Sequence, residues 1–126
     1  ALIAAQTRTA RNTGLKLNIA INYGGRAEIV RAARMLAQKA VSGEITPEDI
    51  DENAFAAALY THDLPDVDLL IRTSGEMRLS NFLLYQCAYA EMEFPAVLWP
   101  DFSLADYHAA LEAFAARDRR FGGRKQ

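Results

Sequence analysis

The chain has 126 residues, of which 51% are hydrophobic and 24% charged, so it can bury the core of one globular domain. Its formal net charge of −2 argues against a general nucleic-acid-binding protein, because such proteins carry a basic face. The single cysteine, Cys87, excludes an internal disulfide and is typical of a cytoplasmic protein. The sequence contains no uncharged apolar stretch that approaches the length of a membrane span.

The first third of the chain predicts helix, strand and helix. Residues 2–14 indicate the end of a helix that closes at Asn12 or Gly14. "LKLNIAIN", residues 15–22, alternates between apolar and polar side chains and predicts a strand. "YGGR" predicts a turn, followed by a helix over residues 27–42. One face of that helix carries an apolar stripe made of Ile29, Ala33, Leu36 and Ala40.

The middle of the chain predicts a second helix and a buried strand. Thr46 followed by Pro47 is a strong helix start, and the pattern continues to about Tyr60. "VDLLIRT", residues 67–73, is a short apolar run bounded by polar residues. Such a run is typical of a strand that is covered on both faces.

The last third predicts helix, strand and helix. Residues 81–94 are too many for a typical strand and favour a helix with Ser80 as its N-cap. "AVLWPDF", residues 96–102, predicts a short strand. Residues 104–121 predict an amphipathic helix capped by Ser103.

Strands that alternate with helices predict an α/β fold with a parallel sheet covered by helices. Only three strands can be recognised in the sequence, although a parallel sheet covered on both faces usually has more. We therefore expect the sheet to lack strands on its N-terminal side.

The stretch "IRTSGEMRLSNFLL" gathers Arg72 and Arg78 in one loop, at the expected carboxyl end of a strand and ahead of an expected helix. Ligands of open α/β sheets bind at that edge, and a helix N-terminus favours anions. Gly75 permits a close turn, and Ser80 can cap the helix or donate its hydroxyl. Two arginine forks next to a helix terminus suit a diphosphate group.

The residues by themselves leave a second interpretation of this loop open. Glu76 lies between the two arginines and could orient one of them, or pair with both in an ordinary surface salt bridge. The loop lacks the P-loop pattern. The glycines of "NYGGR" could cradle a phosphate or form a tight turn, and we leave them out of the site. We expect no catalytic or metal role for His62 or His108, which are isolated in the sequence.

The stretch "DLLIRTSGEMRLSNFLLYQCAYAEMEF" resembles the signature region of the cis-prenyltransferases, with the bacterial undecaprenyl diphosphate synthases the closest type. The resemblance continues in "LNIAINYGGRAEI" upstream and in "VLWPDF" and "RDRRFGG" downstream. Tyr85 stands where the family often has Trp, and Ser74 and Met77 occupy variable positions. The resemblance implies that residues 1–126 are the C-terminal part of a single cis-prenyltransferase domain.

The resemblance also implies roles for individual residues. Arg72, Arg78 and Ser80 would bind the diphosphate of isopentenyl diphosphate, with Leu79 contributing its backbone, and Glu91 would be a Mg²⁺ ligand. On a continuous helix, however, Ser80 and Glu91 lie about 16 Å apart along the axis. Glu91 would then serve the metal only through another subunit or a bend, and a solvated glutamate is the alternative.

The tail "RRFGG" also has two interpretations. It could be a solvated basic terminus. In the family, similar tails lie near the active site across a dimer interface, so the resemblance implies a homodimer in which Arg120 and Gly122 support the site.

The family's Asp-Gly-Asn-Gly-Arg motif, which handles the allylic diphosphate and Mg²⁺, does not occur in this sequence. The implied reaction is condensation of isopentenyl diphosphate onto an allylic diphosphate, such as farnesyl diphosphate, to make undecaprenyl diphosphate for delivery to the membrane. No catalytic residue is assigned within the chain, and we expect the chain alone to be inactive. The alternative is a non-catalytic half-domain that binds a diphosphate or a synthase partner.

Overall fold

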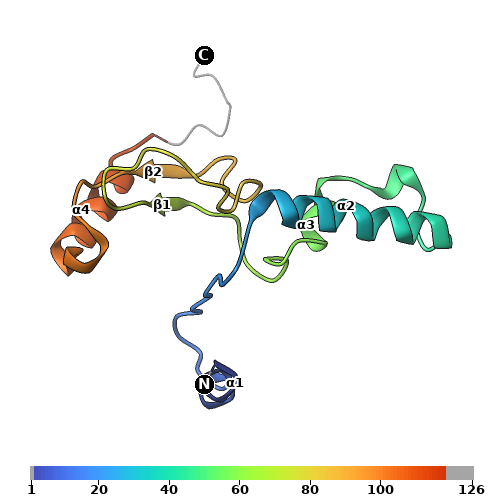
Figure 1. Cartoon of the computed structure of the whole chain (residues 1–126), viewed down its shortest axis with the longest axis horizontal. Coiled ribbons are helices and arrows are strands. Elements are labelled where there is room, and N and C mark those ends of the chain that lie inside the picture. Colours follow the sequence, from blue (N-terminus) through green and yellow to red (C-terminus); the bar gives the residue numbers. More distant parts are fainter. Residues whose placement is uncertain (1, 119–126) are drawn as a thin grey trace.

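The computed structural model describes residues 2–118. In chain order the elements are α1 (Leu2–Thr9), α2 (Gly25–Ser42), η1 (Pro47–Asp49), α3 (Glu52–Ala57), β1 (Leu69–Ile71), β2 (Glu91–Glu93), η2 (Trp99–Asp101) and α4 (Leu104–Ala115), where η denotes a short 3-10 helix. The sheet and α4 lie at one end of the molecule and α2 with α3 at the other, while α1 stands apart (Figure 1).

The two strands form a small parallel sheet. Leu69, Leu70 and Ile71 of β1 pair with Glu91, Met92 and Glu93 of β2, in that order. The chain between them makes the long crossover that a parallel pair requires. The predicted α/β class and the predicted strand within residues 67–73 are therefore confirmed.

The strand predicted over residues 15–22 is not formed. Its apolar side chains are exposed instead, with exposed fractions of 92% for Leu15, 76% for Leu17 and 60% for Ile19. Strand hydrogen bonds need a neighbouring strand, and the described part of the chain places none beside this segment. The alternating pattern is therefore present without the pairing that would make it a strand.

Helix α2 agrees with the predicted helix, but its buried face is turned slightly from the predicted stripe, of which Leu36 is buried and Ile29 and Ala40 are half-buried. Its C-terminus is closed by Gly43 at φ 76°, in the left-handed region that glycine adopts readily. The buried positions include Glu28, Ala32 and Leu36, whereas Ala33 from the predicted stripe is exposed. The predicted stripe differs from the buried face because a stripe of apolar residues leaves out Glu28. The Glu28 side chain is only 1% exposed and packs inward as a hydrogen-bonded carboxylate.

The helix predicted from Pro47 to Tyr60 is divided in two. Thr46 and Asp49 form a capping box around η1, as the start signal suggested. Asp51 then caps a new helix, since its Oδ1 accepts a hydrogen bond from the Ala54 amide at 2.7 Å. Because Asp51 has the extended backbone of an N-cap, η1 ends before it and α3 begins after it.

The helix predicted over residues 81–94 is wrong. Ser80, Asn81 and Leu83 have φ values of 49°, 65° and 44°, which no right-handed helix allows. A series of turns runs to β2, and Ser80 caps no helix. The cause is a tertiary contact: Asn81 accepts hydrogen bonds from the first amides of α2, with its O atom from Gly25 (2.7 Å) and its Oδ1 from Arg26 (2.8 Å).

The strand predicted over residues 96–102 is also wrong, because residues 99–101 form the 3-10 helix η2. Pro100 lacks the amide that a strand ladder needs. Helix α4 begins as predicted after Ser103, whose hydroxyl and backbone form a capping box with Asp106. The four buried residues Ala32, Leu36, Ala58 and Leu59 form a core cluster between α2 and the end of α3.

Candidate functional site

The candidate anion loop, residues 72–80, leaves the carboxyl end of β1 as predicted. Its first half lies along the end of β2 and the chain that follows it: the Arg72 amide donates to the Glu93 carbonyl (2.9 Å) and the Ser74 amide to the Val97 carbonyl (2.8 Å). The turn uses Gly75 at φ 64°, a conformation in which a side chain is strained. The loop is therefore held by backbone hydrogen bonds at the edge of the sheet.

The structure brings Arg72 and Ser80 together. Arg72 Nη1 donates to Ser80 Oγ at 2.9 Å and also to the Arg78 carbonyl oxygen. These two acceptors orient the guanidinium of Arg72 within its own loop. Ser80 thus contributes by accepting from Arg72, because the helix terminus that the sequence predicted at Ser80 does not exist.

Arg78 has a different partner from Arg72. Its guanidinium forms an ion pair with Glu76, and the side chains of Arg78 and Glu76 are 63% and 39% exposed. In the structure, therefore, Glu76 pairs with Arg78, whereas the guanidinium of Arg72 contacts the Ser80 hydroxyl and the Arg78 carbonyl. Leu79 lies between Arg78 and Ser80 and is partly buried.

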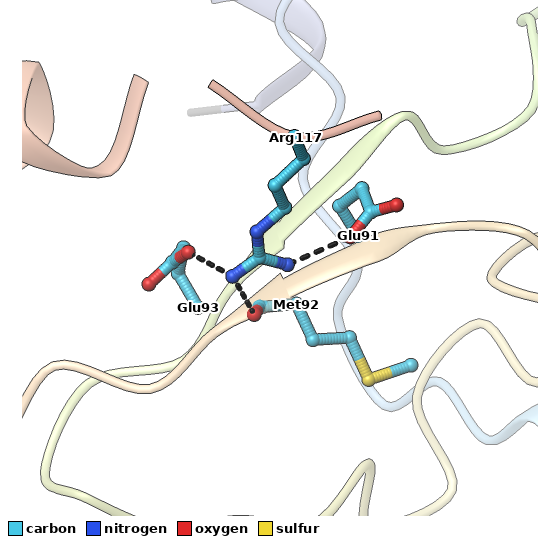
Figure 2. A network of polar contacts seen from close by, with 4 residues as sticks. All are labelled: Glu91, Met92, Glu93 and Arg117. Carbon is cyan, nitrogen blue, oxygen red and sulfur yellow. Dashed lines mark hydrogen bonds and ion pairs between the residues drawn. The ribbon is translucent and has the colours of Figure 1, made fainter. Parts of the chain in front are cut away.

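Glu91 is not on a helix but opens strand β2. The register places it opposite Leu69, at the end of the sheet away from the loop, which begins after Ile71. Figure 2 shows its carboxylate on the guanidinium of Arg117, with Oε2 accepting from Nη1 at 2.7 Å. Glu93 binds the same guanidinium. The pKa of Arg117 is raised, chiefly by the hydrogen bond to Glu91.

The side chains of the described residues do not form a Mg²⁺ centre by themselves. Within residues 2–118, no group of three or more Asp, Glu, His or Cys side chains could hold a metal ion. Glu91 could offer at most one carboxylate, and Arg117 occupies it. His62 interacts with the Leu59 carbonyl, and the His108 ring lies edge-on to the Tyr107 ring. Arg120 and Gly122 lie outside the described residues.

A buried polar cluster, which the sequence interpretation missed, centres on Glu28. Its carboxylate accepts from the Tyr23 hydroxyl (2.5 Å), the Tyr60 amide (2.7 Å) and Gln86 Nε2 (3.0 Å). Burial, and then the hydrogen bond to Glu28, raise the pKa of Tyr23. The only signal in the sequence was an acidic residue on the inward side of an amphipathic helix.

The glycines of "NYGGR" serve this packing. A Cβ atom on Gly25 would lie 2.9 Å from Leu84 Cγ and 3.2 Å from the Asn81 carbonyl oxygen, so the start of α2 can approach the turns only at a glycine. The turn predicted at "YGGR" is therefore not formed, because Gly24 is extended and Gly25 is the first residue of α2, and close packing against residues 81–84 accounts for Gly25. In the described residues no helix is long and apolar enough to cross a bilayer.

Residues 1–122 match the family model described as "Putative undecaprenyl diphosphate synthase". The chain is 56% identical over 119 residues to the ditrans,polycis-undecaprenyl-diphosphate synthase ((2E,6E)-farnesyl-diphosphate specific) of Escherichia coli K12, covering 94% of this chain and 47% of that protein. It is 54% identical over 115 residues to an isoprenyl transferase of Zymomonas mobilis, covering 91% and 46%. The chain spans about half the length of the curated relatives it matches.

Two solved structures share the fold. Lavandulyl diphosphate synthase from Lavandula x intermedia, solved with dimethylallyl diphosphate, matches with a TM-score of 0.92 and 43% identity, over 95% of this chain and 52% of that one. An undecaprenyl diphosphate synthase from Campylobacter jejuni, described as "probable", matches with a TM-score of 0.77 and 34% identity, over 96% and 54%. The family model and these likenesses agree along nearly the whole chain, and the chain therefore belongs to the cis-prenyltransferase family, that of the undecaprenyl diphosphate synthases.

Proposed function

We propose that this chain supplies the isopentenyl diphosphate site of a cis-prenyltransferase. The enzyme would condense isopentenyl diphosphate onto an allylic diphosphate, such as farnesyl diphosphate, to make undecaprenyl diphosphate. The proposal is supported by the name of the Escherichia coli relative, which is 56% identical. The observation that carries it is the loop after β1, where Arg72 and Ser80 are hydrogen-bonded and Arg78 is next but one to Ser80.

The proposed binding chemistry follows from the partners of the two arginines. Arg72 is oriented by acceptors in its own loop, so its fork is arranged before a ligand arrives. Arg78 is exposed and paired only at the surface with Glu76, so a diphosphate, which carries more charge, can replace that carboxylate. Ser80 and the backbone of Leu79 complete the proposed set. Such preorganised positive groups stabilise the charge on the phosphates.

The rest of the proposal concerns the metal, the partner subunit and the catalytic groups. Mg²⁺ would act as a Lewis acid on the leaving diphosphate when bound. Glu91 could be one of its ligands only together with groups from elsewhere. We place Arg120 and Gly122 at the partner's site in a cytoplasmic homodimer. We assign no catalytic residue to this chain, and we expect no prenyl transfer from the 126 residues alone, because the Asp-Gly-Asn-Gly-Arg motif is not among them.

A non-catalytic half-domain remains the second candidate, and the exposed apolar segment at residues 15–21 favours it. Its four large apolar side chains are each at least 60% exposed, as expected for an extended segment without a paired strand: Leu15, Leu17, Ile19 and Ile21. Such a segment suits docking onto a synthase partner by strand addition. Turnover separates the two candidates: a chain that binds diphosphate and catalyses nothing with any partner would support the half-domain.

The test is calorimetric titration of the chain with isopentenyl diphosphate. Arg72→Ala and Arg78→Ala should each weaken the affinity by roughly tenfold to a hundredfold, as expected for a lost charge-assisted hydrogen bond. Arg34→Ala, at an exposed position of α2, removes the same charge away from the loop and should leave affinity unchanged. Equal affinity in all variants would place the anion site elsewhere.

A further inference from the structure

Asn81 joins the end of the candidate anion loop to helix α2. Its backbone oxygen accepts from the Gly25 amide at 2.7 Å, and its Oδ1 accepts from the Arg26 amide at 2.8 Å. Both amides belong to the first turn of α2, where a helix leaves its N–H groups without partners of its own. The residue before the helix is Gly24, which has no side chain to cap it, so Asn81 caps α2 from a distant part of the sequence.

The start of α2 lies close to Asn81 because two glycines stand there. A Cβ atom on Gly24 would lie 2.8 Å from Asn81 Nδ2, and one on Gly25 would lie 3.2 Å from the Asn81 carbonyl oxygen. Helix α2 is itself held in the core by the buried residues Ala32 and Leu36. Asn81 therefore connects the loop to the packed core of the molecule.

Ser80 and Asn81 share a left-handed backbone conformation, with φ values of 49° and 65°. Residues with a side chain are disfavoured in this region, Asn less than most, so the conformation persists only where surrounding contacts hold it. The two hydrogen bonds from α2 to Asn81 are such contacts. They fix the backbone next to Ser80, and with it the position of the Ser80 hydroxyl that accepts from Arg72 Nη1 at 2.9 Å.

We propose that Asn81 is a positioning residue of the candidate anion site, which acts through Ser80 on the guanidinium of Arg72. Asn81 itself needs no contact with the ligand in this role. Because the contacts begin at a helix packed on the core, they set the direction of the Arg72 guanidinium before a diphosphate arrives. This inference rests on the proposed function where it concerns diphosphate, whereas the effect on Arg72 belongs to the ligand-free chain.

The first measurement needs no ligand. It is the rotation of the Arg72 guanidinium about its Nε–Cζ bond, followed by nitrogen-15 NMR of the full 126-residue chain. Asn81→Gly removes the side-chain acceptor of the Arg26 amide, and glycine adopts the same positive φ without strain. The rotation should become roughly threefold to tenfold faster, the size of one neutral hydrogen bond lost. Asn81→Asp keeps an accepting oxygen and should keep the rotation slow.

Two controls separate positioning from a general loosening of the fold. The guanidinium of Arg117 is held at three points on β2 and serves as an internal reference, whose rotation should not change in Asn81→Gly. Asn22→Gly makes the same substitution at another exposed residue with positive φ, 53°, and should change neither rotation. An unchanged rotation of Arg72 in Asn81→Gly would overturn the proposal, and so would an equal acceleration of Arg72 and Arg117.

The second measurement is the calorimetric affinity for isopentenyl diphosphate. Asn81→Gly should weaken it roughly fivefold, and should add nothing in a chain that already carries Ser80→Ala, because both act on the same contact with Arg72. Losses that simply add would show that Asn81 does not act through Ser80.

Failure of this inference can be told from failure of the proposed function. If Arg72→Ala and Arg78→Ala left the affinity unchanged while Asn81→Gly still released the Arg72 guanidinium, the diphosphate site would be wrong and the positioning of Arg72 would stand. If the two arginine variants weakened binding while Asn81→Gly changed neither rotation nor affinity, the site would stand and the positioning role would be wrong.

Discussion

The Nη1 atom of Arg72 lies 2.9 Å from the Oγ atom of Ser80, and this bond ties the first residue after β1 to the end of the candidate loop. The bond joins residues eight positions apart, across a turn that contains two residues with positive φ, Ser74 and Gly75. A serine that accepts from an arginine orients the guanidinium without neutralising it. The positive charge of Arg72 thus stays available to an anion.

Ser80→Ala tests this orienting bond. The variant should bind isopentenyl diphosphate roughly fivefold more weakly, less than Arg72→Ala, because the arginine remains but loses one of its two acceptors. Titration calorimetry measures the affinity, and Ser42→Ala at the end of α2 is the matched control. A loss as large as that of Arg72→Ala would mean that Ser80 itself makes the main contact with the ligand.

Ser103→Ala tests the cap of α4. The hydroxyl of Ser103 accepts from the Asp106 amide, and losing an N-cap of this kind should lower the free energy of unfolding by about 1 kcal/mol. Ser103→Asn keeps a cap acceptor and should cost much less. Urea denaturation measures both values. If the two variants were equally destabilised, the cap hydrogen bond would not be the cause.

Asp106 should make the stability of α4 depend on acidity. Hydrogen bonds from the Ser103 hydroxyl and amide hold the pKa of Asp106 below its ordinary value of 3.8. Because the folded pKa is the lower one, the stabilising contribution is complete above the ordinary pKa and disappears as the pH falls through the folded value. Asp106→Asn cannot titrate, so the stability difference between it and the unmodified chain should shrink on acidification below pH 4. A difference that stayed constant would argue against this linkage.

The Glu28 cluster should respond to an isosteric change. Glu28→Gln replaces one accepting oxygen by an amide that faces the donors, and this should cost roughly 1–3 kcal/mol of the free energy of unfolding. Glu48→Gln, at an exposed position of η1, provides the matched control and should have almost no effect. Chemical denaturation measures both variants, and equal stabilities would contradict the role given to Glu28.

Tyr23 offers a spectroscopic view of the same cluster. Its pKa is raised above the ordinary 10.0, so the stability it contributes is complete below that pH and is lost as the pH rises toward the folded value. In an alkaline titration of tyrosinate absorbance, Tyr23→Phe should remove a late-ionising phenol from the folded chain. If the variant instead lost a phenol with an ordinary pKa, Tyr23 would not be buried against Glu28.

The exposed segment at residues 15–21 should promote self-association. Unpaired apolar segments of this kind are templates for pairing with other chains. Leu17→Lys together with Ile19→Lys should therefore lower the sedimentation-average mass at high concentration. Val41→Lys is the control, since Val41 is 90% exposed on α2 but belongs to no extended segment. An unchanged mass would show that the segment does not drive association.

Local signals predicted part of the fold correctly. The N-cap at Ser103, the start at Thr46 and the short apolar run around Leu70 each act within a few residues. The arginines and the serine of the candidate loop could also be named from the sequence, because their residue types and their place after a strand are local facts.

The remaining features required the tertiary structure. Residues 81–94 look helical, yet Asn81 caps α2 from 55 positions away and the turns lead into β2. Glu91 looks like a solvated or metal-binding glutamate, yet its partner Arg117 lies 26 positions along the chain. The short-range elements and the chemical groups of the loop thus follow from residues that are neighbours in the chain. The pairing of strands and of charged side chains does not, because it depends on contacts between residues that are distant in the chain.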